Sequence, residues 1–94
     1  MGKKHNKAAL GWFKLGAEQG YANAQYNLGI LYANGFGVTQ DYARAYMWWN
    51  IAASKGNTDA VAWRTAVQNV MTPAQIEKAQ DLAQECVAKN YKGC

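Results

Sequence analysis

The chain has 94 residues, of which half are apolar and 17% are charged, and its formal net charge is +4. A chain of this length forms one small domain, and its four tryptophans and six tyrosines can supply the core. Part of the positive charge lies in Lys3, Lys4 and Lys7 at the start, where such a run is typical of a solvated tail. A nucleic-acid or membrane surface needs a basic face, so we expect neither partner.

The sequence has no apolar run long enough to cross a bilayer. Its first ten residues have a positive start but no apolar segment of the kind that a signal peptide contains. We therefore expect no membrane span, and either a cytosolic chain or a processed segment that restarts with an added Met.

The first predicted helix covers Asn6 to Gln19, because apolar residues recur there near helical spacing and Gly20 can end the helix. The second covers about Ala22 to Ala33. Gly29 inside it costs about 1 kcal/mol relative to Ala, so we expect a close approach to another helix there. The stretch from Asn34 to Gly37 then predicts a turn, because both of its glycines can adopt positive φ.

Three more helices are predicted after this turn. Thr39 is placed to cap a helix over Asp41 to Lys55, and Gly56 ends it. A shorter helix runs from Thr58 to Val67. Thr72, Pro73 and Gln75 then form the pattern of a capping box with proline at the first helical position, which starts a helix to about Ala88. One side of that last helix is polar, as expected of a closing helix in a repeat array.

A shift of 36 positions superposes one part of the chain on another. It pairs Trp12 with Trp48, and it also pairs Ala9 with Ala45, Phe13 with Trp49, Leu15 with Ile51, Ala17 with Ala53 and Gly20 with Gly56. A period in the thirties is typical of stacked helical hairpins. Large apolar groups at equivalent positions are what stacking requires, so Trp12, Phe13, Trp48, Trp49 and Trp63 are predicted to lie in the core, not on a base-stacking platform.

The central stretch resembles a Sel1-like repeat, whose pattern is AxxGxxxAQxxLGxxYxxGxGVxxDxxxAxxWxxxAAxxG. The matching positions are Ala17, Gly20, Ala24, Gln25, Leu28, Gly29, Tyr32, Gly35, Gly37, Val38, Asp41, Ala45, Trp48, Ala52, Ala53 and Gly56. On this resemblance the chain is a half repeat (1–20), a full repeat (21–56) and a degenerate capping repeat (57–94) that lacks the Gly-x-Gly-Val turn.

The resemblance implies an all-α fold, an α/α solenoid of antiparallel helix hairpins related to tetratricopeptide repeats, here with about five helices. It also implies a non-catalytic scaffold that binds a protein or peptide and needs no cofactor; many members are bacterial and exported. Alignment with tetratricopeptide positions predicts a concave binding face made of Asn23, Tyr26, Ile30, Asn34, Asp59, Ala62 and Asn69.

A second surface is expected at the N-terminal edge, where the first helix has no upstream neighbour. Its apolar residues are Leu10, Trp12, Phe13 and Leu15. A large exposed apolar patch marks an interface or a truncation. We therefore expect either self-association through this edge or a chain cut from a longer array.

Cys86 and Cys94 raise the question of a disulfide. On one continuous helix their Cα atoms would lie about 12 Å apart, whereas a disulfide needs less than about 7 Å. A bond therefore requires the helix to stop between them, where Asn90 and Gly93 can stop it. Two free thiols, or a metal or redox role, remain open. The spacing is also similar to that in a cysteine-rich, secreted branch of the Sel1-like family. An oxidised pair favours the periplasm or the outside, and free thiols favour the cytoplasm.

The sequence shows no arrangement typical of catalysis. His5 lies in a polar start, where a solvated histidine is expected, and two cysteines with one distant histidine do not complete a zinc site. No nucleophile–histidine–acid set and no phosphate-binding loop is evident. We therefore predict no catalytic residues, no metal and no enzyme activity. The alternative to a protein scaffold is a cell-envelope structural or peptidoglycan-associated protein that recognises glycan through its aromatic residues.

Overall fold

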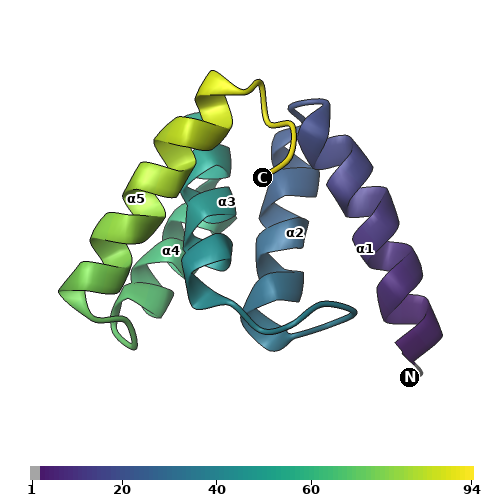
Figure 1. Cartoon of the computed structure of the whole chain (residues 1–94), viewed down its shortest axis with the longest axis horizontal. Helices are drawn as coiled ribbons and strands as arrows, with labels where there is room; N and C mark the ends of the chain where they lie inside the picture. Colours follow the sequence, from purple (N-terminus) through teal and green to yellow (C-terminus); the bar gives the residue numbers. More distant parts are fainter. Residues whose placement is uncertain (1–2) are drawn as a thin grey trace.

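The computed structural model describes the backbone of residues 3–94 and the side chains from Asn6 onward. Within that range the chain forms helices joined by turns, without strands (Figure 1). The helices are α1 (Lys3–Glu18), α2 (Ala22–Asn34), α3 (Tyr42–Ser54), α4 (Thr58–Gln68) and α5 (Pro73–Ala88). The predicted all-α solenoid of helix hairpins is confirmed.

Helix α3 is the centre of the molecule, and it packs against α2, α4 and α5 (Figure 1). An ordinary surface helix buries one stripe of side chains, but α3 is buried on nearly all sides. Its buried residues are Ala45, Tyr46, Met47, Trp48, Trp49, Ile51 and Ala52. They divide between two apolar clusters, one around Trp49 with residues of α4 and one around Trp48 with Ala17 and Leu28. The rest of the fold is therefore built around α3.

Side-chain caps mark the starts of α3, α4 and α5. Thr72 and Gln75 form the predicted capping box, with distances of 3.1 and 2.9 Å between each side-chain oxygen and the backbone nitrogen bound to it. For α3, however, the cap is Asp41, whose Oδ1 accepts the backbone N–H of Arg44 at 3.1 Å. The prediction that Thr39 caps this helix was wrong. The helix begins at Tyr42, so its cap lies two residues beyond Thr39. The N–H of Asp41 donates to the carbonyl of Tyr32, which fixes the turn before the helix.

The carbonyls at the junction between α1 and α2 accept hydrogen bonds from α2 itself and from two distant parts of the chain. A helix leaves its last carbonyls without partners inside the helix. Here the carbonyl of Ala17 accepts from Gln25 Nε2 at 3.2 Å, that of Glu18 from Lys92 Nζ at 2.8 Å, and that of Gly20 from Lys55 Nζ at 2.6 Å. Gln25 is fully buried, and so it fixes α2 against the end of α1.

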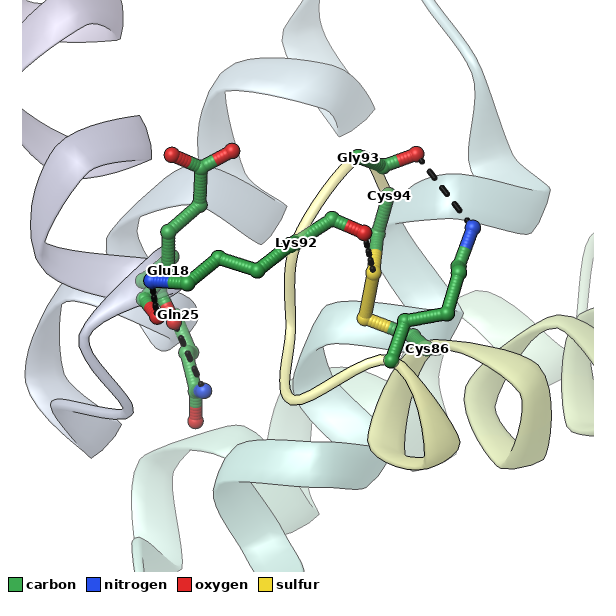
Figure 2. Close-up of a disulfide and its surroundings, with 8 residues drawn as sticks. Glu18, Gln25, Cys86, Lys92, Gly93 and Cys94 are labelled. Carbon is green, nitrogen blue, oxygen red and sulfur yellow. Dashed lines mark hydrogen bonds between the residues drawn. A yellow bond between two sulfur atoms is a disulfide. The ribbon is translucent and has the colours of Figure 1, made fainter.

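A disulfide, one of the alternatives that the sequence left open, joins Cys86 and Cys94, and their Cα atoms are 5.6 Å apart (Figure 2). Helix α5 ends at Ala88, and Asn90 and Tyr91 take positive φ values of 55° and 67°, which turns the chain back. The N–H of Tyr91 then donates to the carbonyl of Cys86 at 2.9 Å, the closing bond of a Schellman motif. The segment 90–94, here called the C-terminal clasp, therefore returns to the α1–α2 junction.

Two of the predicted core aromatics are not core residues. Trp48 and Trp49 are each 2% exposed, but Trp12 is 73% exposed and Trp63 is 50% exposed. The shift of 36 positions pairs Trp12 with Trp48, yet α2 and α5 cover Trp48, whereas no described helix covers Trp12 in the same way. Equivalent sequence positions are thus buried only where neighbouring helices exist.

Candidate functional site

A groove of about 250 Å³ lies between α2 and α4, the first helices of two successive hairpins, with α3 beneath it. We call it the α2–α4 groove. It is lined by Ile30, Ala33 and Asn34 of α2, Tyr42 and Trp49 of α3, Trp63, Ala66 and Val67 of α4, and Val70 in the turn after α4. The lining contains no Asp, Glu, Lys, Arg or His, so the groove offers apolar and aromatic surface with the amide of Asn34 and the hydroxyl of Tyr42.

The floor of the groove depends on Gly29. A Cβ atom at this position would lie 2.5 Å from Nε1 of Trp49, closer than atoms tolerate. Without a side chain, α2 lets the indole lie against its backbone, and Trp49 Nε1 donates to the carbonyl of Tyr26 at 3.0 Å. The expected close approach at Gly29 is therefore the contact with Trp49, which holds that ring in one orientation.

Trp63 stacks on this fixed ring. The two ring centroids are 6.0 Å apart and the planes differ by 28°, an offset arrangement that aromatic pairs favour. Trp49 is buried, whereas half of the Trp63 surface is exposed. Trp63 is therefore an aromatic surface open to solvent, and Tyr42 and Val70 are two further exposed residues of the groove.

The structure brings only some of the predicted binding residues to this groove. Ile30 and Asn34 line it, and Tyr26 lies one helical turn from Ile30 and is half-buried. Asn23 lies instead at the start of α2, where its Oδ1 accepts from Asn57 Nδ2 at 3.2 Å. Asp59 and Ala62 of α4 and its C-cap residue Asn69 are exposed but do not line the groove.

The sequence interpretation missed the largest groove residues, Tyr42, Trp63 and Val70. A signal for one of them, Val70, was present. The shift of 36 positions, applied once more, places Trp63 at the position of Asn27 and Val70 at that of Asn34. A residue equivalent to a predicted concave residue should itself face the groove, so this comparison identifies Val70 directly.

The residues predicted at the N-terminal edge divide into two pairs. Leu10 and Phe13 are partly buried and pack against the cluster around Trp48. Trp12 and Leu15 point outward and are exposed. The edge therefore presents an apolar surface separate from the α2–α4 groove.

The hairpin geometry, the glycine that admits Trp49 and the buried Gln25 agree with one repeat family. The family model described as Sel1 repeat matches residues 2–21 and 22–57. The chain belongs to the Sel1 repeat family. No curated protein matches it. Sel1 repeats form helical solenoids, generally mediate protein–protein interaction and are typically non-catalytic.

The described side chains, from Asn6 onward, include no group of three or more His, Cys, Asp or Glu residues placed to hold a metal ion. Both cysteines are in the disulfide. The side chain of His5 lies outside the described residues. Of the helices described, none has the length and hydropathy needed to cross a membrane.

Proposed function

We propose that this Sel1 repeat chain is a non-catalytic scaffold that binds a protein segment in the α2–α4 groove. In this proposal residues 1–20 and 21–56 are a half repeat and a full repeat, and residues 57–94 are a closing repeat that supplies the second wall. The groove then lies between the first helices of two units, and it works by presenting a surface.

The observation that supports this proposal most directly is the half-exposed Trp63 held on the buried Trp49. Binding energy in protein interfaces is concentrated in a few aromatic anchors that fill pockets. A groove of about 250 Å³ has room for one or two large side chains of a partner. Helix α2 has no charged residue, and the groove lining has none either. The favoured partner segment is therefore an uncharged one with an apolar or aromatic side chain.

The test is selection of short peptides from a displayed random library on the immobilised chain, followed by affinity measurements in solution. Because truncation of an aromatic anchor costs about 2 kcal/mol or more, Trp63→Ala should weaken a selected peptide by about 30-fold or more. Trp12→Ala is the matched control, since it removes an exposed indole outside the groove and should leave the affinity unchanged. Equal affinity of the Trp63→Ala variant and the unmodified chain would contradict the proposed site.

Recognition of a glycan is the second candidate function, in the setting of the cell envelope. It is favoured by the two exposed aromatic residues Trp63 and Tyr42 beside the amide of Asn34. Aromatic faces and a few placed polar groups suit a small ligand with apolar and hydroxyl surfaces. Retention on purified peptidoglycan that Trp63→Ala abolishes, without enrichment of any peptide sequence, would favour this function over the first.

The oxidised Cys86–Cys94 pair bears on where the chain works. Structural disulfides persist in oxidising compartments and are rare where thiols are kept reduced. We therefore infer a periplasmic or extracellular setting for this Sel1 repeat chain.

A further inference from the structure

The outer face of α1 resembles a helix-packing surface. Trp12 is 73% exposed and Leu15 is 54% exposed, and they lie three residues apart on one side of the helix. The positions 36 residues later, Trp48 and Ile51, are buried between helices. The outer face of α1 therefore has the side chains of a buried seam, but no described helix covers them.

Gly11 lies on the same face and gives independent evidence for a close approach. Glycine inside a helix is unfavourable relative to alanine. For Gly16 and Gly29 the compensation is visible, since a Cβ atom there would meet Ala24 at 2.7 Å or Trp49 at 2.5 Å. Around Gly11 nothing lies within 4 Å of such an atom. Nothing among the described residues requires a glycine here, whereas a helix of another molecule crossing at this point would.

The opposite end of the molecule contains an apolar groove. It is lined by residues of α3, α4 and α5, the helices on the side of the molecule away from α1 (Figure 1). This end groove measures about 450 Å³ and includes the exposed Val61 and Val87, with Ile51 and Ala83 at its base. Its polar lining residues are Asn50, Ser54, Arg64 and Gln84.

The charges of the two ends are complementary. On α1, Lys7 and Lys14 are exposed. On α5 the exposed charges are Glu77, Asp81 and Glu85 with one lysine, Lys78, and Arg64 is the one charged residue in the groove lining. Glu77 and Asp81 lie at helical spacings of seven and three residues from the groove residue Gln84. A contact between the α1 helices of two copies would bring like charges together, whereas α1 against α5 pairs opposite charges.

We propose that copies of this chain associate head to tail. The α1 face with Gly11, Trp12 and Leu15 docks in the end groove between α4 and α5 of the next copy. Gly11 marks the helix crossing, and Trp12 enters the apolar part of the groove near Val61 and Val87. Such a contact joins two different surfaces, so repetition produces a ring or an open chain of copies.

The test is sedimentation velocity over a range of protein concentrations. The unmodified chain is expected to increase in mass with concentration, and less so at high salt because exposed charges are screened. Trp12→Arg disrupts the α1 face, here called the head, and Val87→Arg disrupts the end groove, here called the tail. Each variant alone should therefore remain monomeric. Mixed in equal amounts, the two variants should form a dimer and nothing larger, because the mixture retains one intact head and one intact tail.

Trp63→Arg is the control, since it places the same charge on an exposed tryptophan of the α2–α4 groove and should associate as the unmodified chain does. Circular dichroism establishes that each variant is folded; the three substituted residues are exposed. If the unmodified chain remains monomeric at high concentration, the proposal is overturned. Dimers of Val87→Arg alone would also overturn it, in favour of an α1–α1 contact. Neither result bears on peptide binding, which Trp63 controls separately.

Discussion

At the scale of single residues, the glycines inside helices differ in what surrounds them. Gly11 has open space around it, whereas a Cβ atom at Gly29 would overlap the indole of Trp49. The helical backbone gains the same benefit from alanine at either position. The neighbours of the glycine therefore decide whether alanine raises or lowers the free energy of unfolding.

Gly11→Ala should raise the free energy of unfolding by about 0.5–1 kcal/mol, because alanine favours the helix and meets nothing. Gly29→Ala should lower it by about 1–3 kcal/mol, because Trp49 must move and its bond to the Tyr26 carbonyl is strained. Urea denaturation of both variants, in the Val87→Arg background to suppress self-association, measures the difference. Destabilisation by Gly11→Ala in that background would mean that the described surroundings of Gly11 are incomplete.

Burial of individual tryptophans could be predicted only in part from the sequence. Trp48 and Trp49 lie on the central helix, so the apolar pattern was sufficient to place them in the core. Trp12 and Trp63 have the same chemical character, but each lies on a helix with one open side. The repeat pattern indicates which positions face a neighbour, and it does not indicate whether that neighbour exists.

At the scale of helices, the existence and approximate bounds of all five could be predicted because they depend on local signals. Apolar spacing, turn glycines and the Thr72–Gln75 capping box act within a few residues. The start of α3 was harder to predict, since Thr39 and Asp41 are both good cap residues. The choice is made by the turn before it, where Gln40 Nε2 donates to the carbonyl of Ala33 at 2.8 Å and Asp41 N–H donates to that of Tyr32.

The cap of α3 gives a prediction at this scale. Asp41→Ala should lower the free energy of unfolding by about 1 kcal/mol, because the backbone N–H of Arg44 loses its acceptor. Asp41→Asn should cost little, since an amide oxygen replaces the carboxylate and the exposed ion pair with Arg44 at 3.6 Å contributes little. Thr39→Ala is the matched control and should be nearly neutral. Thermal or urea unfolding measures both variants. A larger loss of unfolding free energy for Thr39→Ala than for Asp41→Ala would contradict the assignment of the cap to Asp41.

At the scale of the whole molecule, the C-terminal clasp connects the last helix to the first. Lys92 Nζ and the Glu18 carbonyl are 74 positions apart in sequence but 2.8 Å apart in space. Lys55 Nζ lies 4.1 Å from the centre of the Tyr91 ring and also donates to Gly20. The sequence indicated that a disulfide needs a stop in the helix, but no local pattern could predict where the segment after the stop would lie. That position depends on contacts between distant parts of the chain.

Removal of the disulfide should therefore affect the α1–α2 junction, which the clasp contacts. The double substitution Cys86→Ser with Cys94→Ser should lower the free energy of unfolding by about 2.5 kcal/mol on the chain-entropy model. It should also release the clasp, because its positive-φ residues Asn90 and Tyr91 are no longer fixed by the bond. The Lys92 and Tyr91 contacts at the α1–α2 junction would then be lost.

Hydrogen exchange followed by mass spectrometry measures this directly. The amides of Gly20 and Tyr21, which bond to the end of α1, should exchange faster in the double variant. The amides of Phe36 and Asp41 in the turn between α2 and α3 serve as the internal control and should be affected less, because that turn lies at the other end of α2 (Figure 1). Counting free thiols in the unmodified chain, purified without reductant, should give none. Unchanged exchange at Gly20 and Tyr21 would show that the clasp is not what holds the α1–α2 junction.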